Sequence, residues 1–369
     1  MSLTLESLRL VNFRSYEDFL LEGLGNLTVL VGPNAVGKTN VVEAIQLVTA
    51  IQSFRNPRVD HLVREGSDFG RVEAVMGDGS RLMEVRLQLS EGKKRYVLNG
   101  KGKQAISLKG MCPAVIFTPD DLELVKGSNS VRRDALDSVG CQVSENHRII
   151  KRDFGAVVKN KNALLKEEAR PDLVEAVNAV LVTCSSQLTC YRAALFRRME
   201  PYIAEAYARI SSSQESMTCE YVPSWEEYGV SAEGLSRDEV RDAMAKALDV
   251  AGAQEAARKR ALVGAHADKV RFYIDGKDAS LFASQGQQRS LVLAFKIAEV
   301  AIIRDVLGTQ PILLLDDVMS ELDARRRSCL VDFIEDEMQV FITTTNLEYF
   351  EESLVSRARI VELNRDNCV

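Results

Sequence analysis

The stretch Leu27-Thr28-Val29-Leu30-Val31-Gly32-Pro33-Asn34-Ala35-Val36-Gly37-Lys38-Thr39 decides how this chain begins to fold. An apolar, β-prone run ends at Gly32, the pattern G-x-x-x-x-G-K-T follows, and an apolar helical pattern continues to Ile51. Strand, glycine loop and helix in this order predict a phosphate-binding loop. The two glycines let the backbone turn tightly, so that N–H groups and the helix N-terminus face an anion. A chance glycine turn before a helix is the alternative.

Two residues of this loop carry separate expected roles. Lys38 can reach the β- and γ-phosphates of a nucleotide, and the Thr39 hydroxyl can hold Mg²⁺. Gly32 and Gly37 are expected to bring the backbone to the phosphates. We therefore expect ATP and Mg²⁺ as cofactors, although the loop alone does not say what the nucleotide drives.

The composition limits the class of protein without choosing a partner. A chain of 369 residues can form two domains, or one domain with a large insertion. The formal net charge is −6, so a DNA-binding surface would have to be a local patch. Seven scattered cysteines without a C-x-x-C pair favour reduced thiols over a disulfide scaffold or a zinc site. With no signal sequence and no apolar run long enough to span a bilayer, we expect a cytoplasmic protein.

The hydrophobic pattern changes character along the chain. Residues 3–11 alternate like a strand, and residues 70–100 combine alternating segments with turn signals, which predicts an antiparallel meander. Helical patterns, a hairpin and buried strands follow, at roughly 128–168, 172–213, 236–263, 272–278, 287–308, 312–315 and 340–342. We expect an α/β nucleotide-binding head built from both ends of the chain (1–135 and 262–369), with a helical arm inserted at 136–261.

A second nucleotide motif follows the apolar run Ile312–Leu315. This run ends in Asp316 and Asp317, as a Walker B strand does beside a phosphate-binding loop. Asp316 is placed to bind Mg²⁺, and Asp317 is the candidate base that orients an attacking water. Two adjacent acids repel each other unless a cation or partner offsets them. The alternative is a turn acid after a strand.

A third motif, Ser284-Gln285-Gly286-Gln287-Gln288-Arg289-Ser290, precedes an apolar helix. A serine cap and a glycine at a helix N-terminus make an anion site, although a cap alone would also explain the serine. The pattern resembles the signature motif of the ATP-binding-cassette (ABC) superfamily. In that superfamily the signature of one subunit covers the γ-phosphate held by the other. Ser320-Glu321-Leu322-Asp323 is similar to the D-loop, which also crosses the dimer interface.

Most of the chain resembles the RecF family of SMC-like ABC ATPases. The most family-specific segment is Phe117–Ser128, with the pattern F-x-P-D-D-L-x-L-V-x-G. Further matching segments are Asn12–Tyr16, Gly32–Asn40, Ser53–Arg55, Arg132-Arg133, Leu136-Asp137, Lys161–Lys166, Ser284–Ser290, Leu313–Asp323 and Thr343–Thr345. The resemblance implies an ABC-type head, with a mixed sheet, flanking helices and an antiparallel β subdomain, and a short helical arm.

The resemblance also implies an activity and its residues. It implies a homodimer that forms around two ATP, binds double-stranded, single-stranded or gapped DNA, and is reset by weak, DNA-stimulated hydrolysis. It implies partnership with RecR and RecO in loading RecA during recombinational repair. The catalytic residues would be Lys38, Asp316 and Asp317. The other nucleotide contacts that it implies are Arg14, Asn34, Asn40, Ser284, Gly286, Gln287 and Asp323.

The chain departs from the family pattern at three positions. Where the family has Gly-Pro-His-Arg-Asp, this chain has Gly264-Ala265-His266-Ala267-Asp268, and Asn129 stands where a proline is expected. The expected arginine is therefore missing. No glutamine stands out as a Q-loop residue, and Thr343–Asn346 occupies the position of the switch.

Two groups of basic residues are candidates for DNA contact. One is a predicted hairpin with Lys93, Lys94, Arg95, Lys101 and Lys103, and the other is residues 148–170, with seven basic and three acidic residues. Each phosphate neutralised adds roughly 0.9 to the salt dependence on duplex DNA. Nothing indicates base readout, so we expect binding insensitive to sequence. A solvated helix face is the alternative.

Three other functions remain open. A transporter ATPase subunit is disfavoured by the helical arm between the halves of the head. A chromosome-organising or nuclease-linked head would need a long coiled coil, for which the chain has no room, or a nuclease partner. A scaffold that uses ATP only for shape would keep Lys38 and dispense with Asp317, so the second acid favours hydrolysis.

Overall fold

In the computed structural model, which describes residues 2–212, 215–231, 236–334 and 338–364, the chain divides into two units. The first unit contains residues 1–121 and 299–369, and the second contains residues 122–298. Both ends of the chain thus build one unit, but the boundaries differ from the expected 135/136 and 261/262. Residues 122–135 and 262–298 belong to the unit of the long helices, and direct bonds join these two segments to each other. Arg132 Nη1 donates to Val270 O (2.9 Å), and Asn129 Oδ1 accepts from Val270 N (3.0 Å).

A parallel sheet forms the centre of the first unit. Its strands lie in the order β14-β3-β13-β12-β8, and every neighbouring pair is parallel. The strands are β3 (Leu27–Val31), β8 (Ala114–Phe117), β12 (Ile312–Asp316), β13 (Val340–Thr344) and β14 (Arg359–Glu362). Every residue of β8, β12 and β13 is buried, as near-continuous apolar runs in a parallel sheet require. The predicted strands at 312–315 and 340–342 are confirmed.

An antiparallel sheet forms the other layer of the first unit, in the order β2-β1-β4-β5-β6-β7. Its strands are β1 (Thr4–Phe13), β2 (Tyr16–Glu22), β4 (Phe69–Gly77), β5 (Leu82–Ser90), β6 (Lys93–Leu98) and β7 (Lys101–Lys103). The predicted meander is therefore confirmed. Helix α1 (Lys38–Val48) contacts both sheets and is buried over nine of its eleven residues, so it is the core element between them.

A side chain extends the antiparallel sheet where β2 ends. The pairing of β1 with β2 begins only at Ser7, and β1 is bulged between Leu5 and Ser7 on its β4 side. Gln339 fills the open position: its Oε1 accepts from Leu5 N (2.7 Å), and its Nε2 donates to Leu5 O (2.8 Å). Gln339 leads directly into β13, so this amide ties the two sheets together.

The short elements of the first unit connect these layers. They are η1 (Val59–Leu62), α2 (Ala105–Leu108), η2 (Pro119–Leu122), α10 (Val318–Glu321), α11 (Ala324–Phe333), η4 (Leu347–Tyr349) and α12 (Glu352–Arg357).

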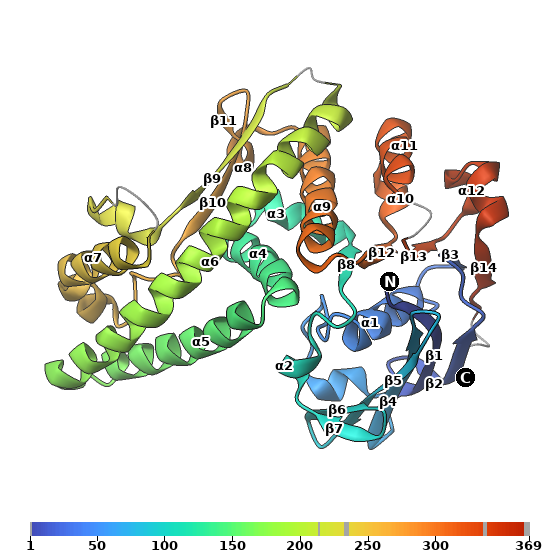
Figure 1. Cartoon of the computed structure of the whole chain (residues 1–369), viewed down its shortest axis with the longest axis horizontal. Coiled ribbons are helices and arrows are strands. Elements are labelled where there is room, and N and C mark those ends of the chain that lie inside the picture. The colour runs from blue at the N-terminus through green and yellow to red at the C-terminus, as the bar shows by residue number, and fades with distance from the viewer. Residues whose placement is uncertain (1, 213–214, 232–235, 335–337, 365–369) are drawn as a thin grey trace. The chain divides into compact units, whose positions relative to one another are not determined.

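Long helices dominate the second unit (Figure 1). They are α4 (Asn129–Val143), α5 (Glu145–Lys166), α6 (Pro171–Ser211), α7 (Arg237–Arg258) and α9 (Gln285–Leu307), whose last turns belong to the first unit. The single helical stretch predicted at 128–168 is two helices, because Ser144 leaves the helical conformation and its side chain caps α5 through His147 N. Helix α6 has 41 residues, a length of about 62 Å, and α5 runs alongside it.

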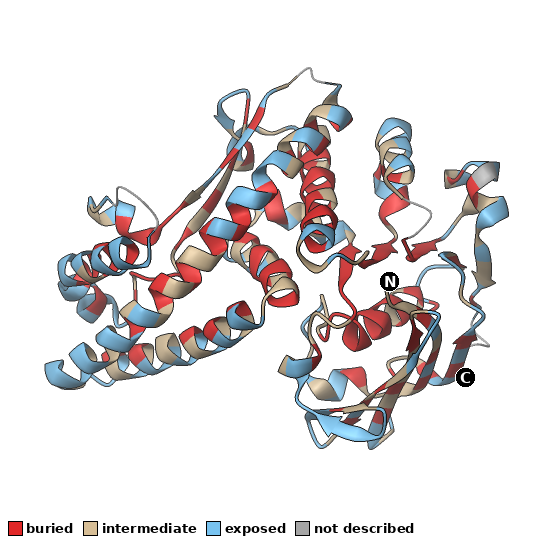
Figure 2. Ribbon diagram, in the orientation of Figure 1, coloured by how far each residue is buried: buried red, intermediate tan, exposed pale blue. Residues whose placement is uncertain are grey.

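A small antiparallel sheet completes the second unit, with the order β11-β10-β9. Strands β10 (Lys269–Ile274) and β11 (Lys277–Asp278) form the predicted hairpin, whereas β9 (Met217–Val222) was not anticipated. The short elements α3 (Glu123–Lys126), η3 (Ser224–Tyr228) and α8 (Ala279–Phe282) lie between the long ones. Figure 2 shows exposed residues gathered along α5 and the N-terminal part of α6.

Helix α6 changes one expectation about membranes. Among the described residues, α6 is the one helix long and apolar enough to cross a bilayer by length and composition, whereas the sequence suggested none. Its C-terminal half is buried around Arg192, Phe196, Met199 and Tyr207, which identifies that half as a packing element of the second unit. Six of the cysteines lie in the described residues and are free thiols, and Cys368 lies outside them.

Candidate nucleotide site

The loop between β3 and α1 has the backbone that its glycines allow. Gly37 has φ of 101°, a left-handed value that side chains rarely adopt. A Cβ at Gly37 would lie 2.6 Å from Tyr16 Oη, and one at Gly32 would lie 2.3 Å from Leu363 O. Both positions are therefore closed to larger residues. Asn34 lies at the exposed tip of the loop.

Lys38 is folded back over this loop. Its side chain is buried, and Nζ donates to Gly32 O (2.6 Å) and Pro33 O (2.8 Å). Burial lowers the pKa of Lys38, and the carboxylates of Asp317 and Asp316 oppose this shift. The ammonium group is thus held where the loop closes and within electrostatic reach of both acids.

Asp316 accepts hydrogen bonds from two threonine hydroxyl groups at the end of the parallel sheet. Its Oδ1 accepts from Thr39 Oγ1 (3.0 Å) and from Thr343 Oγ1 (2.8 Å). Burial raises the pKa of Asp316, and these hydrogen bonds only partly oppose the shift. The two predicted Mg²⁺ ligands, Thr39 and Asp316, therefore lie side by side, and a hard cation prefers oxygen donors of this kind.

Asp317 sits at the turn between β12 and α10 in a left-handed conformation (φ 53°). Its N–H donates to Thr343 Oγ1 (2.9 Å), which fixes the turn. Its Oδ1 is buried and has no hydrogen-bond partner among the described residues. An orphaned buried carboxylate oxygen beside a phosphate-binding loop fits a site completed by a bound water or ligand. The donor set of this chain therefore fits ATP with Mg²⁺.

Arg14, a predicted nucleotide contact, is bound to a buried acid, Glu43, in this structure. Its Nε and Nη2 donate to both oxygens of Glu43 at 2.9 and 3.0 Å, and its Nη1 donates to His61 O (2.8 Å). Glu43, on α1, is fully buried and also accepts from Ser53 Oγ (2.6 Å). Most of the donors of Arg14 are therefore occupied within the protein.

Arg55 is the residue that sequence reasoning missed. Its Nη1 donates to Asn40 Oδ1 (3.0 Å) and lies 3.6 Å from Glu43, and its side chain is 39% exposed. Its positive charge opposes the rise in the pKa of Asp316 that burial causes. The only signal was the segment Ser53-Phe54-Arg55, which was noted for its resemblance and given no role. The predicted contact Asn40 is held between Arg55 and Ser15, because its Nδ2 donates to Ser15 Oγ (3.1 Å).

The signature residues lie in the second unit, at the start of α9. Ser284 is exposed, its Oγ accepts from Gln287 N (3.2 Å), and its N–H donates to Gln287 Oε1 (2.7 Å). Gly286 lies in the first turn of α9. In the first unit, Asp323 caps α11 by accepting from Arg326 N (2.9 Å) and forms an ion pair with Arg326.

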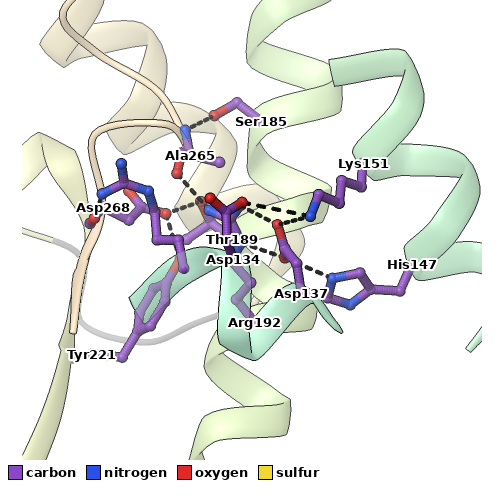
Figure 3. Close-up of polar contacts among 11 residues, drawn as sticks. Asp134, Asp137, His147, Lys151, Ser185, Thr189, Arg192, Tyr221, Ala265 and Asp268 are labelled. Atoms are coloured by element: carbon purple, nitrogen blue, oxygen red, sulfur yellow. Dashed lines mark hydrogen bonds and ion pairs between the residues drawn. The ribbon is translucent and has the colours of Figure 1, made fainter. Parts of the chain in front are cut away.

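A buried polar cluster holds the segment that departs from the family pattern (Figure 3). Arg192 donates to both oxygens of Asp137 (2.8 and 2.7 Å), which His147 Nε2 contacts at 2.9 Å and Lys151 Nζ at 3.1 Å. Burial would raise the pKa of Asp137, but these partners hold it well below its usual range. Arg192 also bonds Ala265 O. The cluster therefore fixes the backbone at the altered position.

Further side chains satisfy the rest of this irregular segment. Ser185 Oγ accepts from Ala265 N (2.7 Å), and Ser224 Oγ accepts from Gly264 N (3.0 Å). Asp268 accepts from Thr189 Oγ1, Tyr221 Oη and Ser224 N at 2.5–2.8 Å. Buried loops need such partners for their backbone groups. None of these bonds uses the side chain of residue 265 or 267, so the segment is held with alanine at both positions.

The two basic groups have solvent-exposed members. Lys93, Lys94, Arg95, Lys101 and Lys103 are exposed on β6 and β7, which confirms the predicted hairpin. On α5, Arg152, Lys159 and Lys166 are exposed, whereas Lys161 is fully buried in an ion pair with Glu255 (2.6 Å). Lys161 is therefore a packing residue and not a candidate for DNA contact.

The fold and the site define an ABC-type ATPase head. Heads of Smc proteins have the same fold: the Smc head with an extended coiled coil from Pyrococcus furiosus matches with a TM-score of 0.56, at 16% identity, over 100% of this chain and 95% of that chain. The family described as RecF/RecN/SMC N terminal domain matches residues 4–367.

Within this class the chain belongs to the RecF family. The DNA replication and repair protein RecF of Synechococcus sp. is 35% identical over 98% of this chain and 96% of its own length. RecF of Symbiobacterium thermophilum is 36% identical over 93% of this chain and 92% of its own length. The solved structure of the recombination mediator protein RecF-ATPrS in the RecFOR pathway has a TM-score of 0.86 at 27% identity, covering 95% of this chain and 94% of that one.

Proposed function

We propose that this protein is an ATP-dependent DNA clamp of recombinational repair, in which two copies close around two ATP. The observation that carries this proposal is the oxygen set of Thr39, Asp316 and Asp317 beside Lys38, in which Asp317 Oδ1 has no partner among the described residues. A protein that used ATP only for its shape would not need that second acid. Family membership and the ATP-bound relatives support the choice of nucleotide.

Each residue would have one role in the site. Lys38 would exchange its carbonyl partners for phosphate oxygens, and the loop from Gly32 to Gly37, with Asn34 and Asn40, would line the phosphates. Thr39 and Asp316 would hold Mg²⁺, which when bound offsets the charge of the β- and γ-phosphates. Asp317 would orient the attacking water. Arg55, and less directly Arg14, would supply further positive charge.

Each site would be completed by the other copy. Ser284, Gly286 and Gln287 would meet the γ-phosphate held by the partner, and Asp323 would lie at the same interface. The exposed Ser284 at a helix N-terminus supports this role, because such a terminus attracts anions. A single chain would then bind ATP yet hydrolyse it poorly.

The physiological role follows the family. The closed dimer would bind double-stranded, single-stranded or gapped DNA through the exposed basic residues of β6, β7 and α5, without base readout. It would support RecA loading with RecR and RecO in the cytoplasm, and slow, DNA-stimulated hydrolysis would reset it. The head would be residues 1–135 and 262–369, with the arm at 136–261, although 122–135 and 262–298 pack with the helices.

Light scattering with and without ATP, and with a gapped DNA duplex, tests this proposal. The expected result is a doubling of mass with ATP. Asp317→Asn should retain the ATP-bound dimer while hydrolysis falls, because binding residues remain and water is no longer oriented. Ser284→Arg should bind ATP as a monomer. A wild-type protein that stays monomeric with saturating ATP would overturn the clamp.

A further inference from the structure

One carboxylate joins the end of the longest arm helix to the signature. Glu215 follows α6, and its Oε1 accepts from Gln287 Nε2 of the signature (2.8 Å). Its other oxygen, Oε2, accepts from the hydroxyl group of Tyr207 on α6 (2.6 Å). Tyr207 is fully buried, so the carboxylate is held against a rigid part of the second unit. Both oxygens of Glu215 are thus engaged, each by a different element.

The carboxamide of Gln287 has a fixed orientation because of this contact. Its oxygen accepts from Ser284 N (2.7 Å), so its nitrogen must be the atom that faces Glu215. The return bond from Gln287 N to Ser284 Oγ (3.2 Å) closes a reciprocal cap at the start of α9. Glu215 therefore acts on Ser284 through a single intervening side chain.

The backbone beside Glu215 is itself anchored. Ser216 N donates to Asp275 Oδ1, and Asp275 N donates to Ser216 O, both at 2.9 Å. Asp275 lies in the turn between β10 and β11, from which the chain continues through α8 to the signature. The backbone next to Glu215 is therefore fixed by hydrogen bonds to Asp275.

We infer that Glu215 is a positioning residue for the signature and, through Tyr207, the link between α6 and the half-site that a second copy would use. This inference rests on the proposed function. By holding Gln287, Glu215 keeps the Ser284 cap and the N-terminus of α9 in the geometry that receives the γ-phosphate of the partner. Without it, Gln287 regains rotamer freedom that dimerisation must then remove.

The alternative role for the negative charge of Glu215 is to weaken ATP-dependent dimerisation. A carboxylate near an anion site repels a phosphate, and in that case its removal would strengthen ATP-dependent dimerisation. Two hydrogen bonds to the carboxylate favour the positioning role, because they hold it toward Tyr207 and Gln287. The two roles predict effects of opposite sign, so one measurement separates them.

The experiment compares four single variants with the wild type by sedimentation at a series of ATP concentrations. Glu215→Ala and Gln287→Ala should each raise the ATP concentration for half-maximal dimerisation by about tenfold, as expected for a lost charge-assisted contact. Tyr207→Phe, which keeps the buried ring, should raise it about threefold. The matched control is Glu220→Ala on β9, whose carboxylate contacts Arg271 and Tyr273 and not the signature; it should leave the midpoint unchanged.

Two further variants distinguish positioning from general damage. Glu215→Gln can keep both contacts, donating to Tyr207 and accepting from Gln287, and should stay within about threefold of the wild type. The double variant Glu215→Ala/Gln287→Ala should dimerise no more weakly than the weaker single variant, because both substitutions remove the same contact between Glu215 and Gln287. ATP affinity of the monomers, measured in the Ser284→Arg background, should be unchanged.

The outcomes are separable. A wild type that does not dimerise with ATP overturns the proposed function itself. If the wild type dimerises, a Glu215→Ala variant with an unchanged or lowered midpoint overturns the positioning role. The positioning role is also overturned if Glu215→Ala and Glu215→Gln raise the ATP midpoint of dimerisation equally, or if the effects of Glu215→Ala and Gln287→Ala add in the double variant.

Discussion

Two buried carboxylates, Glu43 in the first unit and Asp137 in the second, are built alike and used differently. Each is fully buried and receives two hydrogen bonds from one arginine. The arginine on Asp137 is 5% exposed, whereas Arg14 on Glu43 is 19% exposed and the second arginine, Arg55, is 39% exposed. The Asp137 cluster also has a partly exposed cation, Lys151 (37% exposed), but it lies in the second unit, whereas the Glu43 cluster holds Arg55 against Asn40, next to Thr39.

The composition of an arginine–carboxylate pair does not by itself indicate the role of the pair. The two clusters differ in the groups that the other N–H donors of their arginines contact. Arg192 donates its third hydrogen bond to the buried carbonyl oxygen of Ala265. Arg55 contacts Asn40, the neighbour of Thr39, and its charge acts on Asp316. The first cluster should therefore govern stability, and the second should govern ATP affinity.

Asp137→Asn should give the largest effect. Removing one partner of a buried pair leaves Arg192 uncompensated, and we expect the unfolding free energy to fall by about 3–5 kcal/mol. Urea denaturation measures this change. ATP affinity of the protein that remains folded should be that of the wild type; a loss of affinity without a loss of stability would break the contrast between the two clusters.

Lys38→Ala should have the opposite effect to Asp137→Asn: ATP affinity should fall while the unfolding free energy changes little. Among the described residues, its ammonium group donates to carbonyl groups of its own loop, so we expect a change in unfolding free energy below about 1 kcal/mol. ATP affinity should fall by about a hundredfold or more, since charge-assisted contacts to the phosphates are lost. Titration with a fluorescent ATP analogue measures it, and retained tight binding would contradict the assignment of the loop.

Arg55→Ala and Arg14→Ala compare the two arginines that share Glu43. Arg55→Ala should weaken ATP binding by about tenfold with little loss of stability, because its guanidinium is partly exposed and contacts Asn40, next to Thr39. Arg14→Ala should chiefly lower stability, since it strips two hydrogen bonds from a buried carboxylate. Equal effects of the two changes on ATP affinity would show that both arginines face the nucleotide.

Acidification should give the smallest effect. The pKa of Asp137 lies below its unfolded value of about 3.9, so its contribution to stability is fully present above about pH 5 and is lost as the pH falls further. Between pH 6 and pH 3.5 the difference in unfolding free energy between wild type and Asp137→Asn should narrow by about 0.7 kcal/mol. A difference that widens toward low pH would mean that another group dominates.

Local motifs were predictable from the sequence, and long-range partnerships were not. The loop from Gly32 to Thr39 and the acids after β12 could be located because each lies between a strand and a helix that the sequence itself encodes. The unit boundaries could not, because Arg132 and Asn129 bond Val270, far along the chain. Strand β9 was missed because its partner, β10, also lies far from it along the chain.

The same limit applies within the site. Thr39 and Asp316 were assigned to one cation, and they do meet, since Thr39 lies in the first turn of the helix after β3 and Asp316 ends β12 at the same edge of the parallel sheet. Nothing in the sequence indicated that Glu43 would engage Arg14, because that requires knowing how the turn between β1 and β2 faces α1. Nor did it indicate that Glu215 would contact Gln287, which lies 72 residues away.

Gln339 shows how much backbone pairing can depend on a single side-chain atom. Its amide offers one acceptor and one donor to Leu5, as a neighbouring peptide group would, and so acts as a one-residue strand where β2 has ended. Glutamate has nearly the same shape but at neutral pH carries only acceptors. A glutamate at position 339 would still accept from the N–H of Leu5, but its second oxygen would face the carbonyl oxygen of Leu5 and repel it. The hydrogen bond to Leu5 O therefore depends on the proton-bearing nitrogen of Gln339, and a change of one atom would remove it.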